Sequence, residues 1–533
     1  MKWKFNYRLL RQITAFTLIG IVLFRVVVIN IIDVTIRKQL DKIRQPGITV
    51  DYSGLSIGWF STSVKIGQIE IIGMGQSDTA IHISVEHMLI QDVRLRELFF
   101  QKKILVGRIS LDKTTISSKT GQHLEWKDFP EEKDFKPGLV VTSDELRFKN
   151  FQWNHYDERD TLAMTASSER FSVLGLKYRS KASISERFTF DSIGCREFSF
   201  TSPAIQHKFT VGSLDFSQAM KELDIGEVRV IPLLDKIEFA NYFKRQVDRI
   251  ECYTKKIQLT GVSYLDDGHF YLKARKMDFD LHMETFRNKT YPFLREKFSL
   301  LPREMLKKTG FPFDIDTFAL DQGFIAYEEL DSLYYNPGRI YFNELRIRAN
   351  HLSNDPKYGG NTIFASSNFM ESGAIKAEFY FPEDTAEKYT VKGVLSPMNL
   401  RELNGIMKAA SLFEVRTGTL DTMTFEIFYD KTKAKGKVEF AFSDLKLTAY
   451  KKKSPDKISL MRTFVANQVI RMNKVKNASL TGIIDYQRNP VRSVVFNWWR
   501  SLFSGIKAAF VKDGTIRPNR NKKNELDVKF DED

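Results

Sequence analysis

The chain has 533 residues, enough for about one to four domains and a large hydrophobic core. Lysine and arginine outnumber aspartate and glutamate by 81 to 66, so the net charge is +15, which suits anionic partners such as phospholipid headgroups or envelope polymers. Phenylalanine (43) and tyrosine (19) are abundant and proline (15) is scarce, which excludes a largely disordered chain and favours strands. The cysteines, Cys195 and Cys252, allow at most one disulfide and do not identify the redox compartment.

An apolar segment near the N-terminus has the length of a membrane-spanning helix. The stretch 13–32 would rise about 30 Å as a helix, the thickness of a bilayer's hydrocarbon core. Only Arg25 and Asn30 within it are strongly polar, and the residues before it are basic, so we predict an uncleaved anchor. A cleaved signal peptide is the alternative, although no small-residue cleavage site follows. Basic residues flank both ends, so charge alone does not orient the segment.

From Ile48 onward, apolar and polar residues alternate with a period of two, which predicts strands that have one apolar and one polar face. The clearest pair of strands would meet across a turn at 430–436. The first carries Met423, Phe425, Ile427 and Tyr429 on one face, and the second carries Val438, Phe440 and Phe442. Such strands are typical of an antiparallel sheet that is solvated on one side. Alternating helices are lacking, which argues against a βαβ fold.

The chain also has weak internal repetition. Stretches that begin at Leu146, Ile257 and Phe318 share one scheme, in which a short strand, a turn and two further strands follow one another. Stretches of helical or irregular character lie at 232–250, 292–308 and 400–413. We expect these stretches to cap strand ends or to cover an exposed sheet edge.

The residues 491–511 return to a helical period. One stripe holds Val495, Trp499, Leu502, Ile506 and Phe510, with Trp498 and Phe503 at its margins. Two interpretations stay open: a helix that lies at a membrane interface, and a helix that plugs the end of the sheet. The membrane-contact candidates are Trp498, Trp499, Leu502, Phe503 and Ile506. The charged tail at 512–533 is predicted to be disordered.

The motif search argues against catalysis. Gly54–Gly58 matches G-x-S-x-G, but strand pattern rather than helix follows Ser56, so a strand edge is the better interpretation. The spacing of the eight histidines matches no metal-binding motif. Asp266-Asp267-Gly268 resembles a fragment of a calcium loop, but a hairpin turn is the better interpretation. Nucleotide-binding motifs are missing. We therefore predict a protein that is not an enzyme, with no catalytic, cofactor-binding or metal-binding residues.

Both ends of the chain resemble AsmA-like proteins of Gram-negative envelopes. The apolar segment is followed by IRKQLDKIRQPGITVDYSGLSIGWFSTSVKIGQIEIIG and then by ISVEHMLIQDVRLRELFFQKKILVGRISLDKTTI. The positions that match the family's pattern are Val93, Leu95, Leu98, Phe99, Ile104, Val106, Ile109 and Leu111, although Lys113-Thr114 departs from it. The stretches LFEVRTGTLDTMTFEIFYD, VEFAFSDLKL and NPVRSVVFNWWRSLFSGI are similar to the C-terminal region of Bacteroidota-type members.

The resemblance implies a mainly β fold: a transmembrane helix, then a long twisted antiparallel sheet rolled into a groove, with a few short capping helices. The implied segments are a cytoplasmic segment (1–12), a transmembrane anchor (13–33), a periplasmic β-groove (34–412), a C-terminal β-region (413–490), the amphipathic helix (491–511) and the tail (512–533). The protein would sit in the inner membrane by a single pass, with its bulk in the periplasm.

The implied function is to bind or conduct phospholipid along an apolar groove between envelope membranes. Its partners would be phospholipid or another lipid, the membrane and other envelope proteins, and not nucleic acid. The lipid-groove candidates are Met423, Phe425, Ile427, Val438, Phe440 and Phe442. The alternative is a structural or regulatory envelope-assembly protein without lipid transfer, whose apolar sheet faces pack against each other.

Overall fold

The computed structural model describes most of the chain after residue 47. The described residues are 26, 29, 30, 34 and 48–512, with gaps at 59–61, 75–78, 95, 98–102, 121–139, 180–187, 267–268, 295–297, 332–335, 384–386, 452–453 and 475–478. The predicted anchor at 13–33 and the predicted tail at 512–533 therefore lie almost entirely outside the described residues. Among the helices that are described, none combines the length and the apolar character needed to cross a bilayer.

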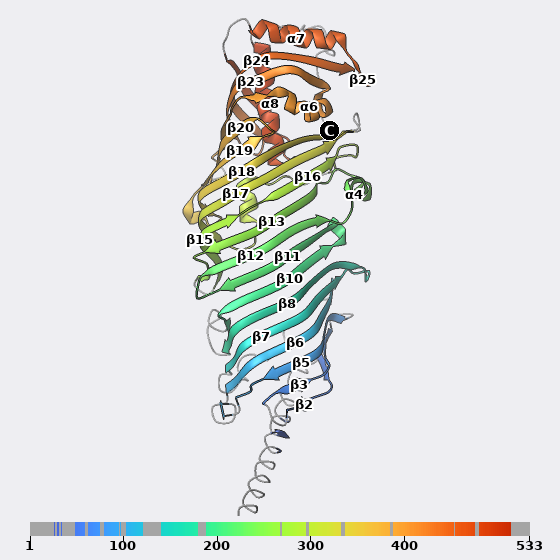
Figure 1. Ribbon diagram of the computed structural model, residues 1–533, viewed down its shortest axis with the longest axis vertical. Helices are drawn as coiled ribbons and strands as arrows, with labels where there is room; N and C mark the ends of the chain where they lie inside the picture. The colour runs from blue at the N-terminus through green and yellow to red at the C-terminus, as the bar shows by residue number, and fades with distance from the viewer. Residues whose placement is uncertain are drawn as a thin grey trace, which may run out of the picture. The chain divides into compact units, whose positions relative to one another are not determined.

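The chain divides into two compact units, and each is built on a β-sheet (Figure 1). Unit 1 comprises residues 1–205 and 210–219, and unit 2 comprises residues 206–209 and 220–533. The prediction of a mainly β fold is confirmed. β11 (His207–Ser217) contributes residues to both units.

Unit 1 contains strands that mostly pair with their neighbours in sequence. They are β1 (Ile48–Tyr52), β2 (Ser56–Ile57), β3 (Val64–Ile66), β4 (Ile69–Met74), β5 (Thr79–Gln91), β6 (Lys103–Lys119), β7 (Val140–Tyr156), β8 (Leu162–Arg179), β9 (Phe188–Thr189) and β10 (Ser192–Ser202). Their pairing is antiparallel except between β6 and β7, which run parallel. The short 3₁₀ helix η3 (Pro203–Ile205) follows β10.

Unit 2 continues with strands and holds the longer helices. The strands are β12 (Glu222–Pro232), β13 (Arg249–Thr260), β14 (Ser263–Asp266), β15 (His269–Phe279), β16 (His282–Asn288), β17 (Phe313–Leu330), β18 (Gly338–Ser353), β19 (Asn361–Phe369), β20 (Gly373–Phe381), β21 (Tyr389–Leu395), β22 (Met398–Asn399), β23 (Phe413–Tyr429), β24 (Lys433–Lys451), β25 (Ser454–Ile458) and β26 (Leu480–Gln487). The helices are α4 (Lys236–Phe243), α5 (Pro302–Lys307), η4 (Pro356–Tyr358), η5 (Leu400–Leu403), α6 (Asn404–Ser411), α7 (Leu460–Lys474) and α8 (Val494–Lys512).

The prediction of a wholly antiparallel sheet is wrong, because both units are mixed. β17 runs parallel to β15 and β16 in unit 2, as β7 does to β6 in unit 1. A parallel pair needs a connection that returns to the starting end of the sheet. The chain has a long connection at each of these places, 120–139 before β7 and 289–312 before β17.

The long strands share an interruption in the middle, which we term the bulge row. In β6, Ile109 and Leu111 face the same side as Thr114 and Ile116, so the step between the two halves is three residues instead of two. The neighbouring strand β5 makes a matching step between Val85 and Met88, and both of these residues belong to one hydrophobic cluster. The pairing register is therefore the same on both sides of the interruption. Extra residues of this kind bend a strand and increase its twist.

Each three-residue step has two residues between its apolar positions. The second of these two residues often adopts the left-handed backbone conformation. The residues are Lys113 in β6, Asn150 in β7, Glu197 in β10, Glu227 in β12, Gln322 in β17, Glu344 in β18 and Asp444 in β24, with φ between 50° and 56°. This conformation costs an L-residue about 1–2 kcal/mol. The same spacing without a left-handed residue occurs in β5, β8 and β13.

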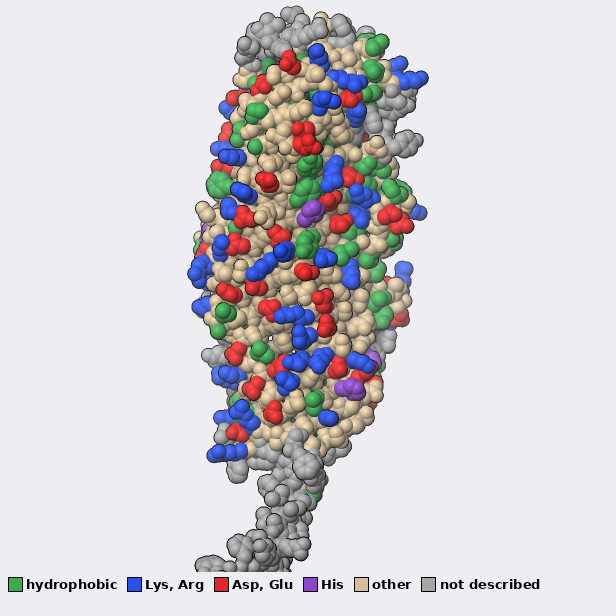
Figure 2. Space-filling model, viewed as in Figure 1, with side chains coloured by type: hydrophobic (Ala, Val, Ile, Leu, Met, Phe, Trp, Pro, Cys, Tyr) green, Lys and Arg blue, Asp and Glu red, His purple; other side chains and the backbone are tan. Residues whose placement is uncertain are grey.

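The side chains of the bulge row lie on the polar side of the sheet and bind one another. In unit 1, the Nζ of Lys113 lies 2.7 Å from a carboxylate oxygen of Glu86, and the Nδ2 of Asn150 donates to Asp112 at 3.0 Å. Figure 2 shows a face on which charged side chains of both signs are spread over the strands. Polar side chains therefore cover the polar face also at the bulge row, where the apolar–polar alternation shifts by one residue.

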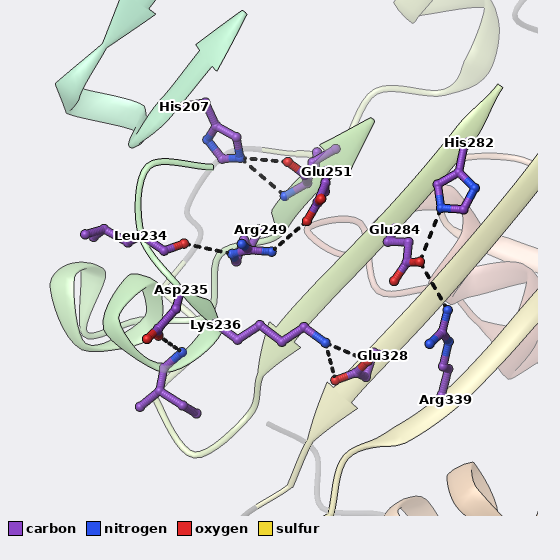
Figure 3. A network of polar contacts seen from close by, with 12 residues as sticks. His207, Leu234, Asp235, Lys236, Arg249, Glu251, His282, Glu284, Glu328 and Arg339 are labelled. Atoms are coloured by element: carbon purple, nitrogen blue, oxygen red, sulfur yellow. Dashed lines mark hydrogen bonds and ion pairs between the residues drawn. The ribbon is translucent and has the colours of Figure 1, made fainter. Parts of the chain in front are cut away.

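The helix α4 is held at the strand ends of unit 2 by polar contacts (Figure 3). Asp235 caps it by accepting hydrogen bonds from the backbone N–H groups of Ile237 and Glu238, both at 2.8 Å. The Nζ of Lys236 reaches both carboxylate oxygens of Glu328 at 2.8 Å. The Nε of Arg249 donates to the carbonyl oxygen of Leu234 at 3.0 Å. The stretch 232–250, predicted to be helical or irregular, therefore contains the helix α4.

The other stretches predicted to be helical or irregular, and the predicted helix at 491–511, also contain helices, and one helix was not predicted. The stretch 292–308 contains α5, 400–413 contains η5 and α6, and 491–511 contains most of α8. We did not predict α7, which lies along β24. Its sequence, LMRTFVANQVIRMNK, has no clear apolar stripe, so periodicity gives little signal there.

Candidate functional site

The apolar face of unit 1 is the first candidate for a binding surface. The strands β7, β8 and β10 line it with side chains that face one another in register. These are Leu146, Phe148, Phe151 and Trp153 from β7; Ala166, Phe171 and Val173 from β8; and Ile193, Phe198 and Phe200 from β10. The rings of Phe148 and Phe171 are 6.0 Å apart. At the bulge row the apolar–polar alternation shifts by one residue where the strand bends. The apolar side chains of both halves of each strand therefore lie on this face.

Most of these side chains are only half-buried. The described residues between 140 and 202 form no α-helix, and the principal contacts of β7 and β10 are with adjacent strands. At the β1–β5 end the same face is closed by a small core of Val64, Ile66, Ile69 and Val85. The described part of the face therefore passes from a closed end to a half-buried apolar surface.

Unit 2 has a similar face in its first strands. It is lined by Leu223, Ile225, Val228 and Val230 of β12, by Ile257 and Leu259 of β13, and by Phe318, Leu320 and Ile325 of β17. Leu259 and Leu320 are buried, whereas the β12 side chains are half-buried. The rings of Phe279 and Phe318 contact each other edge to face at 5.2 Å.

The C-terminal end of this face is filled by the protein itself. The helix α8 lies against β26, β24 and β23. Ile427, Val438 and Phe440 are buried, and Met423, Phe425 and Phe442 pack against the same core. The ring of Phe510 on α8 lies 5.7 Å from Phe440 and 5.9 Å from Phe442. The lipid-groove candidates chosen from the sequence thus lie together on one face, and side chains of α8 occupy the space next to them.

The membrane-contact candidates divide into two groups. The ring of Trp498 lies 5.1 Å from Phe379 and 6.0 Å from Tyr429, and Leu502 and Ile506 pack into the same core. Trp499 is 47% exposed, and Phe503 is half-buried. Contacts of α8 with the sheet favour the interpretation of a helix that plugs the sheet end and leaves Trp499 at the surface.

The buried amide of Asn497 ties the start of α8 to the backbone. Asn497 is fully buried, and its Nδ2 donates to the carbonyl oxygens of Asn489 and Ser493 at 2.9 and 3.0 Å. The guanidinium of Arg488 lies 5.0 Å from the ring centroid of Tyr429. Burial raises the pKa of the Tyr429 phenol, so the group is neutral at physiological pH.

The polar face of unit 2 carries a concavity that sequence reasoning missed. It has a volume of about 660 Å³ and lies over β18–β24. Cationic side chains surround the apolar side chains Phe364 and Val394: Arg346, Arg348, Lys376, Lys392 and Lys437. The Nζ of Lys392 is paired with Glu426 at 3.1 Å. These five cations come from four different strands, so only the pairing register brings them together.

The remaining sequence motifs are structural in the described residues. Ser56 opens β2 and pairs with Lys65 of β3, so strand follows it where a nucleophile elbow needs a helix. Asp266 pairs with His269, which confirms the predicted hairpin. Cys195 and Cys252 belong to different units, and both are free thiols.

Comparison with known proteins adds no family assignment, since no protein-family model and no curated protein matches the chain.

Proposed function

We propose that this protein is a membrane-anchored, AsmA-like envelope protein that binds or conducts phospholipid along the apolar faces of its sheets. The observation that supports the proposal most is the half-buried apolar face of β7, β8 and β10, whose principal contacts are with adjacent strands. The sequence resemblance at both ends and the apolar segment at 13–33 point in the same direction.

The physical argument is the cost of leaving such a face in water. Burial of apolar surface is worth about 25 cal/mol per Å², so a row of half-exposed aromatic rings has a strong driving force for a covering layer. Large contiguous apolar patches on a protein surface usually mark an interaction site. An acyl chain can cover a bent strip of this kind without any specific hydrogen bonds.

The position of the lipid differs from that of the candidates chosen from the sequence. The side chains around Phe440 already contact α8, so the proposal moves the lipid to β6–β10 of unit 1 and to β12–β18 of unit 2. In unit 2, α8 then marks a closed end of the apolar face.

Site-specific photo-crosslinking in the full chain tests the proposal. A benzophenone amino acid would replace Phe171 on the apolar face of β8, in cells grown with ³²P-phosphate. We expect a radiolabelled phospholipid adduct after illumination. The matched controls are Glu169, which lies on the polar face of the same strand, and Ile427, which lies beneath α8. We expect neither control position to give a labelled adduct.

The alternative is a structural envelope protein whose apolar face is covered by another protein. In that case the probe at Phe171 would give protein adducts without radiolabel. A labelled adduct of equal yield at Glu169 would also count against the proposal, because it would indicate general contact with a membrane.

A further inference from the structure

A cluster of possible metal ligands lies where β17 and β18 pair in unit 2. Asp314 and Asp316 are two residues apart on β17, so they share a face of the strand. The pairs Ile315–Leu352 and Thr317–Asn350 place His351 of β18 opposite Asp316. One ligand atom from each of the three side chains lies within 4.8 Å of the others. Sequence spacing did not reveal this cluster because the ligands come from different strands.

Two atoms of the cluster are buried without a hydrogen bond. Asp314 is only 7% exposed, and among the described residues neither its Oδ1 nor the Nε2 of His351 has a hydrogen-bond partner. These two atoms face each other at 3.3 Å without hydrogen-bond geometry. A buried carboxylate oxygen without a partner is costly, and a shared cation would satisfy both atoms at once.

We propose that Asp314, Asp316 and His351 bind a divalent transition-metal ion, and that Zn²⁺ fits best. Two carboxylates balance the charge of the ion, and the imidazole binds it in its neutral form. Ligands about 2.0–2.2 Å from a tetrahedral zinc ion are separated by roughly 3.4 Å, close to the separation of the Asp314 and His351 atoms. An imidazole ligand disfavours Mg²⁺ and Ca²⁺, which prefer oxygen.

The surroundings of the cluster restrict the imidazole and leave one side open. The ring of Tyr358 packs edge-on against His351 with centroids 4.2 Å apart, which limits rotation of the imidazole. Asp316 is exposed, so its carboxylate can turn toward the ion and the fourth position can hold water. The ion would join β17 to β18 near the end of their pairing.

Zinc titration of the purified full chain, carrying a tag without histidine, tests this site. After treatment with a chelator, calorimetry should show one saturable Zn²⁺ site per chain, with no comparable heat from Mg²⁺. His351→Ala and Asp316→Asn should each weaken Zn²⁺ binding at least about tenfold. Zn²⁺ should also raise the melting temperature of the original chain and not that of His351→Ala. Asp316 is exposed, so its variant keeps the test valid if His351→Ala folds poorly.

His282→Ala is the matched control, because His282 also lies 3.3 Å from a carboxylate, that of Glu284, but without a second acidic partner at that site. Its Zn²⁺ affinity should equal that of the original chain. A chain that shows no saturable Zn²⁺ binding would overturn the proposal. The same conclusion follows if His351→Ala and Asp316→Asn bind Zn²⁺ as tightly as His282→Ala, because the Asp314–His351 contact would then be a simple ion pair.

Discussion

Gly505 of α8 lies directly against Gly482 of β26. A Cβ atom placed on Gly482 would overlap the carbonyl oxygen of Gly505, and a Cβ atom on Gly505 would lie 2.6 Å from Ile484 and 2.7 Å from Val438. The backbones of the helix and the strand are therefore in contact. The glycine that interrupts the helical pattern of 491–511 is the residue that allows α8 to sit on the sheet.

We expect Gly482→Ala to lower the free energy of unfolding of unit 2 by about 2–3 kcal/mol, because the added methyl group must push α8 away from β26. Chemical denaturation followed by tryptophan fluorescence would measure the change, since Trp498 reports on the interface. The control is Gly405→Ala in α6, where the new Cβ would lie 3.7 Å from Arg339 and helix propensity improves. Equal stability of the two variants would contradict the close approach.

The adjacent tryptophans of α8 provide a second test. We expect Trp498→Ala to destabilise unit 2 by about 3 kcal/mol, because the ring packs between Phe379 and Tyr429. Trp499→Ala should cost less than about 1 kcal/mol, because its side chain is largely exposed. Thermal unfolding of the two variants would separate these effects. If α8 instead lay on a membrane through both rings, the two variants would unfold alike and both would lose membrane affinity.

The bulge row predicts opposite effects of glycine at two facing positions. Glu197 of β10 has φ 50°, whereas Glu169 of β8 opposite it is not left-handed. Glu197→Gly should raise the free energy of unfolding by up to about 1 kcal/mol, and Glu197→Val should lower it by about 1–2 kcal/mol. At Glu169 the order should reverse, since valine favours a strand and glycine weakens it. Urea denaturation of the four variants measures the order, and the same order at both positions would argue against the left-handed residue.

The hairpin between β23 and β24 predicts a defined pH dependence. A carboxylate oxygen of Asp430 accepts hydrogen bonds from the N–H groups of Thr432 and Lys433 at 2.7 and 2.9 Å. Burial opposes ionisation, but these hydrogen bonds prevail and hold the pKa of Asp430 below its ordinary value of 3.8. The ionised group therefore stabilises the fold above pH 3.8, and this contribution is lost as the pH falls through the lowered pKa.

We accordingly expect Asp430→Asn to melt at a lower temperature than the original chain at pH 7, by an amount equivalent to about 1 kcal/mol. The two melting temperatures should converge as the pH falls below about 3.8. Asp421→Asn on the same hairpin is the control, because Asp421 is exposed and its carboxylate accepts a hydrogen bond from the Ser443 side chain and not from the backbone N–H groups of a turn. A difference between Asp430→Asn and the original chain that stays constant down to pH 2 would show that charge is not its source.

Period-two alternation was sufficient to predict the faces of single strands and the pairing of β23 with β24. Phe425 lies opposite Val438 and Met423 opposite Phe440, as the pattern predicts. The same alternation was not sufficient in the middle of the long strands, because a search for a strict period rejects the three-residue step between Leu111 and Thr114. The repeat of that step from strand to strand was visible in the sequence and would have identified the bulge row.

Other features depend on chain pairing that no local pattern encodes. The parallel strand pairs follow long connections, and the sequences of the strands do not specify the direction in which the chain returns. The Asp314–His351 cluster and the concavity around Phe364 bring together residues that only the register makes neighbours. The filling of the apolar face around Phe440 required knowing where α8 docks, because its amphipathic stripe suits a bilayer and a sheet equally well.

The matched three-residue step has a consequence for how this chain can change in length. Deleting one residue between Leu111 and Thr114 would invert half of β6, carrying Thr114 and Ile116 to the charged side while Ile109 and Leu111 stay in place. Adding or removing a complete hairpin leaves the three-residue steps of the neighbouring strands unchanged. Homologous chains should therefore differ by whole strand pairs, and single-residue gaps should be confined to the turns.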